Sequence, residues 1–168
     1  MKKLSLILVL STWTVPCFAQ TTQPPKPGAE QQALQDFFVG TWSCEFSTVK
    51  GAVKQSCEMT LRGFFLECRQ EGSQGVGLVS VAGYRPEQNS YTMFRYWANG
   101  SSDFGRGWLH GNTWTYVFDN EVASGKTRRR QVTITGSSPP GAFTTKWETS
   151  VEGEAWQVTQ EGKCTKTK

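Results

Sequence analysis

From Thr41 onward, apolar and polar residues alternate in short runs instead of recurring at helical spacing. The runs are rich in Thr, Val, Phe, Tyr and Trp, and they are separated by Gly, Asn, Asp and Pro. This pattern predicts about ten strands, over residues 41–49, 52–61, 64–71, 76–84, 90–98, 102–110, 113–119, 127–136, 142–151 and 155–165. Before them, residues 29–38 have the pattern of a short helix, with Ala33, Leu34, Phe37 and Phe38 on or near one side.

One face of the predicted sheet is apolar along most of the chain. Trp114, Tyr116 and Phe118 alternate with polar or smaller residues, as do Phe143 and Trp147, and then Trp156 and Val158. Sequential strands with one apolar face and no helices to cover it either close into a barrel or fold over as a sandwich. Closure also removes exposed strand edges. We therefore predict an all-β fold, a single antiparallel up-and-down barrel, and keep the sandwich as the alternative.

Two glycine turns predict the register of the first hairpins, because glycine adopts the positive φ of tight β-turns. A turn at Arg62-Gly63 places Met59 opposite Leu66. A turn at Lys50-Gly51 places Trp42 opposite Met59. Later in the chain, a two-residue loop at Gly111-Asn112 pairs Gly107 with Tyr116, whereas a three-residue loop pairs Trp108 with Tyr116 or a near neighbour. The pattern leaves this last choice open.

The first nineteen residues resemble an export signal. Two lysines precede the apolar run 4–10, and Cys17-Phe18-Ala19 forms a small-residue cleavage site before Gln20. The run is too short for a transmembrane helix, and no other segment is apolar enough to be one. We predict an exported protein, periplasmic or secreted, with a Pro-rich tether over 20–28 and a barrel domain over 29–168. The alternative is a lipidated Cys17, although Pro16 fits that signal poorly.

Removing this leader changes the charge of the chain. The full sequence has 18 Lys and Arg against 14 Asp and Glu, and residues 1–19 contain two of the lysines and none of the acids. The mature surface is therefore close to neutral, which argues against a nucleic-acid partner. The sequence makes no prediction of oligomeric state.

The four cysteines after the leader, Cys44, Cys57, Cys68 and Cys164, are an even set in a predicted exported domain, which favours disulfides. They lack the close pairs typical of zinc sites. Cys57 and Cys68 are equidistant from one glycine turn, and Cys44 and Cys57 from the other. In a closed barrel the last strand neighbours the first, so we favour Cys44–Cys164 with Cys57–Cys68. Cys44–Cys57 with Cys68–Cys164 is the alternative.

The segment Phe37-Phe38-Val39-Gly40-Thr41-Trp42 resembles the start of lipocalin-like (calycin) barrels, in which a short helix leads into Gly-x-Trp. This resemblance implies that Gly40 and Trp42 close one end of the barrel under a basic side chain, here Lys163 or Lys166. Together with Gly63 to Glu67, Gly83-Tyr84 and the run from Tyr91 to Trp97, the segment resembles the bacterial domain of unknown function 1579. The resemblance covers residues 30–166, implies a calycin-like fold, and carries over no functional residues.

The sequence contains no convincing catalytic set. His110, the only histidine, lies beside Gly111-Asn112, where we expect a solvent-exposed turn. The acids are scattered, and no spacing singles out a catalytic pair. We predict no catalytic residues, no metal site and no cofactor.

Aromatic residues and one arginine are the candidate ligand-binding residues. Tyr96, Trp108, Tyr116, Phe118 and Trp147 are candidates for the walls of an interior cavity. Arg130 shares its strand parity with Val132 and Ile134, so it is a candidate to bind an anionic head group. The alternative is that the run 128–130 is an exposed strand end. We predict binding of a small apolar or amphipathic ligand. The alternatives are an interaction or structural protein of the envelope with a filled barrel, and an enzyme of unrecognised type.

Overall fold

The computed structural model describes residues 25–73, 75–121, 127–137, 140–152 and 154–168. The predicted export signal and the first part of the tether lie outside these residues. One helix is followed by ten strands: α1 (Ala29–Phe38), β1 (Gly40–Phe46), β2 (Ala52–Thr60), β3 (Phe65–Gly72), β4 (Gly75–Arg85), β5 (Ser90–Trp97), β6 (Ser102–His110), β7 (Thr113–Glu121), β8 (Thr127–Gly136), β9 (Ala142–Val151) and β10 (Gln157–Lys166). Two short 3₁₀ turns, η1 (Leu61–Gly63) and η2 (Pro86–Gln88), join β2 to β3 and β4 to β5.

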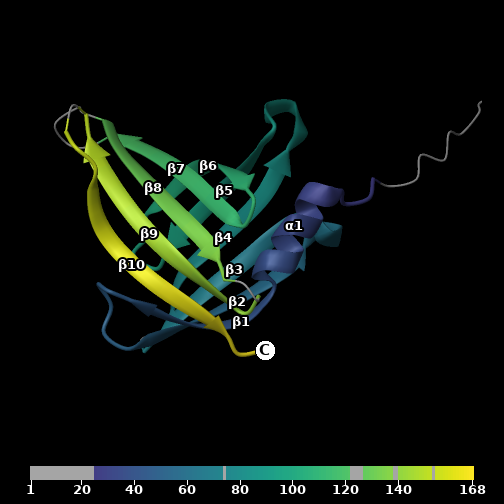
Figure 1. Ribbon diagram of the computed structural model, residues 1–168, viewed down its shortest axis with the longest axis horizontal. Helices are drawn as coiled ribbons and strands as arrows, with labels where there is room; N and C mark the ends of the chain where they lie inside the picture. The colour runs from purple at the N-terminus through teal and green to yellow at the C-terminus, as the bar shows by residue number, and fades with distance from the viewer. Residues whose placement is uncertain (1–24, 74, 122–126, 138–139, 153) are drawn as a thin grey trace, which may run out of the picture.

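The ten strands form a closed antiparallel barrel, which confirms the predicted fold over the sandwich. Each strand pairs with the next along the chain, and β10 pairs with β1 to close the sheet (Figure 1). Antiparallel neighbours alternate in direction, and β1 begins directly after α1. Strands β1, β3, β5, β7 and β9 therefore end at the side of the barrel away from α1, which we call the far end.

One of the two predicted hairpin registers is confirmed and the other is wrong. Across β2 and β3, Met59 lies opposite Leu66, as the turn at Arg62-Gly63 predicted. Across β1 and β2, Trp42 lies opposite Gln55 and not Met59. The reason is the length of the connection: β1 ends at Phe46 and β2 begins at Ala52, so the loop is longer than the two-residue turn assumed.

The last strand also departs from the prediction. Trp156 and Val158 were predicted to share the buried face, yet they are 45% and 52% exposed. A β-bulge between Val158 and Gln160 shifts the register of β10 against β9. An extra residue on one strand reverses the side to which the following side chains point. As a result, the alternation that buries Cys164 does not extend back to Trp156.

The disulfides are Cys44–Cys164 and Cys57–Cys68, as favoured from the sequence. Cys44 lies directly opposite Cys164 across β1 and β10, and Cys57 lies opposite Cys68 across β2 and β3. The alternative pairing of Cys44 with Cys57 is wrong because Cys44 lies opposite Val53 in the observed register. Cys44–Cys164 thus joins the first and last strands of the barrel.

Helix α1 covers the near end of the barrel with its apolar side. Leu34 and Phe38 are fully or almost fully buried. The Phe38 ring lies 5.4 Å from that of Trp114 and 6.0 Å from that of Phe143. Phe143 in turn packs edge-on against Trp42, with ring centroids 4.8 Å apart. This aromatic cluster fills the near end of the barrel.

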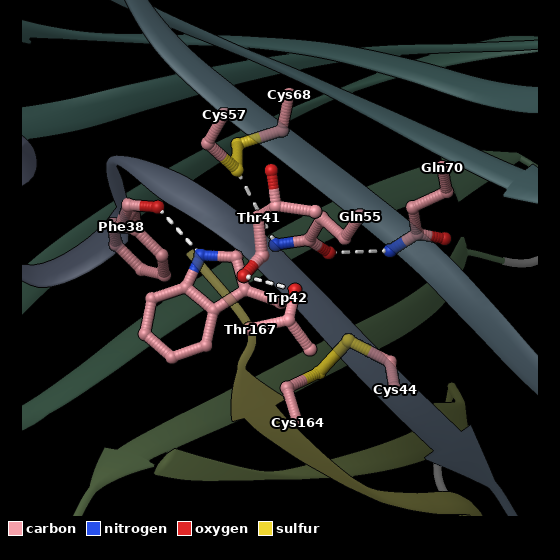
Figure 2. The surroundings of a disulfide bond; sticks show 10 residues. All are labelled: Phe38, Thr41, Trp42, Cys44, Gln55, Cys57, Cys68, Gln70, Cys164 and Thr167. Carbon is pink, nitrogen blue, oxygen red and sulfur yellow. Dashed lines mark hydrogen bonds between the residues drawn. A yellow bond between two sulfur atoms is a disulfide. The ribbon is translucent and has the colours of Figure 1, made fainter. Parts of the chain in front are cut away.

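Gly40 and Trp42 lie at this near end. The Trp42 indole N–H donates a hydrogen bond to the Phe38 carbonyl at 2.8 Å (Figure 2), and the ammonium of Lys166 lies 5.3 Å from the ring centroid. Of the two lysines considered from the sequence, Lys166 therefore occupies the position over the tryptophan. Gly40 has φ +134°, and a Cβ there would approach Lys166 Cε and the Lys168 carbonyl oxygen to 2.6 Å. Glycine is required for this close approach.

Tyr91 lies at the same near end of the barrel, and it makes the stability of the fold decrease at alkaline pH. Its hydroxyl donates to the Glu30 carbonyl of α1 at 3.3 Å. Burial is the largest cause that raises the pKa of Tyr91 from 10 to about 12, and the charges of Glu30 and Tyr84 contribute to the same shift. Between these pH values the native protein keeps a proton that the unfolded chain loses, so stability falls as pH rises.

We expect Tyr91→Phe to reduce this alkaline loss of stability. One such tyrosine contributes a slope of up to about 1.4 kcal/mol per pH unit. The measurement is denaturant unfolding of both proteins at several values between pH 10 and 12, the interval set by the shift. Equal losses in the two proteins across this interval would show that Tyr91 does not contribute.

Candidate functional site

Two glycines of β6 allow the large rings of β7 to fold across the inside of the barrel. A Cβ on Gly105 would lie 2.4 Å from the Phe118 ring, and one on Gly107 would lie 2.4 Å from the Tyr116 ring. Gly107 lies directly opposite Tyr116, so the two-residue form of the Gly111-Asn112 loop is the correct one. Trp108 is therefore opposite Thr115 and points to the outer face.

The barrel interior contains a cavity of about 580 Å³. Its lining extends from Phe38 of α1 to Thr48, Gly77 and Gln160 near the far end. Much of its wall is apolar, including Leu66, Ala82, Met93, Val132, Ile134 and Phe143. The barrel is therefore not filled by its own side chains.

One wall of the cavity holds a buried ion cluster, formed by Arg95 of β5, Asp103 of β6 and Arg130 of β8. Arg95 binds both carboxylate oxygens of Asp103, through Nε at 2.8 Å and Nη2 at 2.5 Å. Arg130 Nη2 contacts the same Oδ2 of Asp103 at 2.5 Å. The side chains of Arg95 and Asp103 are 5% and 1% exposed, and that of Arg130 is 30% exposed. The cluster thus unites three strands inside the barrel.

Aromatic rings enclose the Arg95 guanidinium. Its carbon lies 3.8 Å from the centroid of Phe118, 4.5 Å from that of Trp147 and 4.8 Å from that of Trp97. Burial lowers the pKa of Arg95, and the hydrogen bonds to Asp103 oppose that effect. Cation–π contacts and the carboxylate together compensate for the lost hydration of this cation.

Three buried polar atoms of cavity-lining residues have no hydrogen-bond partner among the described residues: Tyr116 Oη, Arg130 Nε and Thr145 Oγ1. Tyr116 is completely buried, and burial raises the pKa of its hydroxyl, which keeps the hydroxyl as a potential donor. Buried polar groups are normally paired, so an unpaired set around one cavity is unusual. The wall of the cavity therefore contains buried polar atoms that the described residues leave without a partner.

A glutamine pair adds polar groups on another wall (Figure 2). Gln70 donates to the Gln55 side-chain oxygen at 2.8 Å, and Gln55 contacts Cys57 Sγ at 3.4 Å. Both glutamines line the cavity, as do Cys68 and Cys164 of the two disulfides. These disulfides therefore hold part of the cavity wall in place.

The six predicted ligand-binding residues fall into three groups: three line the cavity, one is buried beside Arg95, and two are exposed. Tyr116, Arg130 and Trp147 line the cavity. Phe118 is buried inside the barrel beside Arg95.

The predicted wall positions of Tyr96 and Trp108 are wrong, because their side chains are 51% and 41% exposed. In β5 the residues of the opposite parity, Arg95 and Trp97, line the cavity, so Tyr96 points outward.

The sequence interpretation missed Arg95 and Asp103. Their signal was present: a hairpin closing near Asn99-Gly100 places Arg95 directly opposite Asp103, as observed. Strand parity also sets Arg95 with Trp97. The exposed-end interpretation holds for Arg128 and Arg129, which are exposed, and Arg129 pairs with Asp119 on the outer face at 2.8 Å. It does not hold for Arg130.

Metal-binding groupings are not seen in the part of the chain that the structure describes. No three His, Cys, Asp or Glu residues there are arranged to hold a metal ion. His110 is exposed at the end of β6 and is not among the residues lining the cavity. Within the described ranges, no helix has the length and apolar character needed to cross a membrane.

Fold and site together define the class of protein: a closed barrel of ten strands with a cavity in its interior, in which two disulfides each join a pair of neighbouring strands. No protein-family model matches the chain, and neither does any curated protein.

Proposed function

We propose that this protein is an exported, calycin-like barrel that binds one small apolar or amphipathic molecule in its interior. The observation that carries the proposal is the cavity of about 580 Å³ inside the barrel. Sites for small molecules have volumes of about 300–1,000 Å³ and combine apolar walls with a few polar groups. The cavity favours this function over a structural protein with a filled barrel.

Export and membership of the domain of unknown function 1579 form part of the same proposal. Export is supported by the signal-like segment 1–19 and by two disulfides, which persist in oxidising compartments. The calycin-like assignment is supported by the up-and-down topology and by Trp42, buried beneath Lys166 where the helix leads into β1. The enzyme alternative gains no support from His110, whose side chain is exposed outside the cavity wall.

A cavity-filling variant tests the proposal. Ala82 is buried and lines the cavity, whereas Ala52 is exposed at the start of β2. We expect wild type to bind the neutral fluorophore N-phenylnaphthylamine, and Ala82→Phe to weaken binding by about tenfold or more because its ring occupies part of the cavity. Ala52→Phe, which adds the same ring outside, should bind like wild type.

The measurements are fluorescence titration, with circular dichroism to show that each variant is folded. Native mass spectrometry of the protein before any extraction should also show a co-purified small molecule. Equal affinities in folded Ala82→Phe and Ala52→Phe would place the fluorophore outside the cavity and refute the proposal.

A further inference from the structure

We propose that the ligand carries one negative charge, a carboxylate in the simplest case, and that Arg130 binds this head group. The inference rests on the proposed function and names the class of ligand. Its basis is an unbalanced charge inside the barrel, an unpartnered donor on Arg130, and an apolar path that leads away from it.

The cluster separates the roles of the two arginines. Arg95 uses Nε and Nη2 in its bidentate contact with Asp103, and aromatic rings cover its guanidinium. Arg130 shares Oδ2 of the same carboxylate through Nη2 alone, and its buried Nε has no partner among the described residues. Arg130 Nη2 also donates to the side-chain oxygen of Asn120 at 2.7 Å. In this orientation of the amide, the Asn120 side-chain nitrogen donates to the Asp119 carbonyl. The Arg130 side chain is 30% exposed and lines the cavity, whereas that of Arg95 is 5% exposed, so Arg130 is the arginine of the cluster that a ligand can reach.

The charges of the cluster do not cancel. Two guanidinium groups face one carboxylate, which leaves one positive charge on this wall. Among the described residues that line the cavity, Arg95 and Arg130 are the charged ones. A buried ionic group is costly unless it is paired, so a single anion beside Arg130 would complete the balance. A carboxylate also matches the planar guanidinium geometry.

The position of Arg130 also sets the direction of the ligand. Strand β8 runs from the far end toward α1, and Gly136 at its end lies against Phe37. Arg130, Val132 and Ile134 line the cavity in that order along the strand. A second, smaller hollow of about 310 Å³, lined by Asn99, Ser101, Ser102 and Asn120 among others, also reaches Arg130. The head group thus lies toward this polar region and the apolar tail toward α1.

Three ligands with one tail test the charge requirement: dodecanoate, dodecanol and dodecyltrimethylammonium. We expect wild type to bind dodecanoate about tenfold or more tightly than dodecanol, since charge-assisted hydrogen bonds are about twice as strong as neutral ones. The cation should bind most weakly. Binding is measured by calorimetry and by the fluorescence of the tryptophans, of which Trp97 and Trp147 line the cavity near the cluster.

Two matched variants test the residue. Arg130→Gln and Arg129→Gln remove the same charge from adjacent positions, but Arg129 lies on the outer face paired with Asp119. Arg130→Gln should abolish the preference for dodecanoate, so that dodecanoate and dodecanol bind with affinities within about twofold of each other. Arg129→Gln should keep the wild-type preference.

Each other result has a defined meaning. Two results with the wild-type protein alone would overturn the negative charge assigned to the ligand: equal binding of all three ligands, or tightest binding of the cation. Both results leave the proposed function intact. A preference that survives in Arg130→Gln, or disappears equally in Arg129→Gln, overturns the role of Arg130. Binding of none of the three ligands by wild type overturns this inference, whereas the cavity-filling test above decides the proposed function separately.

Discussion

Replacing Cys44 and Cys164 together with alanine is expected to lower the free energy of unfolding by about 5 kcal/mol, by the chain-entropy model for a long disulfide loop. The bond joins residues separated by 120 positions, so in the unfolded chain it closes almost the whole barrel sequence into a loop. Removing it gives the unfolded state much more conformational freedom. In the native state it also removes the covalent link across the β1–β10 seam, where the sheet closes.

The second disulfide provides the matched control. Cys57–Cys68 spans 11 positions and also joins directly opposed residues of neighbouring strands. The same model assigns about 3 kcal/mol to this short loop. The Cys57→Ala/Cys68→Ala protein should therefore be about 2 kcal/mol more stable than Cys44→Ala/Cys164→Ala. Guanidinium unfolding of the three proteins measures the difference, and equal losses would mean that loop length does not determine the effect.

Replacing Asp103 with asparagine is expected to cost about 3–5 kcal/mol, the loss typical of breaking a buried ion pair. The substitution keeps the size of the side chain but removes its charge. Arg95, with its side chain 5% exposed, then keeps a guanidinium charge with no compensating carboxylate, and Arg130 lies beside it. Two like charges within one buried cluster add repulsion to the lost attraction.

Asp119 supplies the control for this change. It forms a similar contact with Arg129, also through Nε at 2.8 Å, but both side chains are about half exposed. Exposed pairs contribute little because water screens them, so Asp119→Asn should leave the unfolding midpoint almost unchanged. Thermal and denaturant unfolding measure both variants. Similar stabilities of Asp103→Asn and Asp119→Asn would show that the buried cluster is not a source of stability.

Local sequence pattern was sufficient for the elements and for most of the topology. The alternation of large and small residues around Trp114, Tyr116 and Phe118 predicted β7 correctly, because successive side chains of a strand point to opposite faces. The turn at Arg62-Gly63 predicted the pairing of Cys57 with Cys68. Closure of a sequential sheet then left Cys44 opposite Cys164.

Register was less predictable where loops and bulges are irregular. The loop between β1 and β2 is longer than its Lys50-Gly51 dipeptide suggested, so Trp42 pairs with Gln55. The bulge after Val158 moved Trp156 out of the buried set. Neither irregularity has a strong signal in the alternating pattern. The pattern does not report a residue's partner on the next strand, and a bulge reverses the side to which the residues beyond it point.

For the candidate site, the sequence singled out Tyr116, Trp147 and Arg130, which line the cavity, but not the arrangement that makes Arg130 distinctive. That arrangement depends on closure of the barrel, which brings Arg95 and Asp103 from neighbouring strands to Arg130 two strands further on. Strand periodicity is a local property of a few residues, and it determined the class of fold. The cavity, its volume and its unbalanced charge arise from side chains distant in sequence, so only the folded barrel decided them.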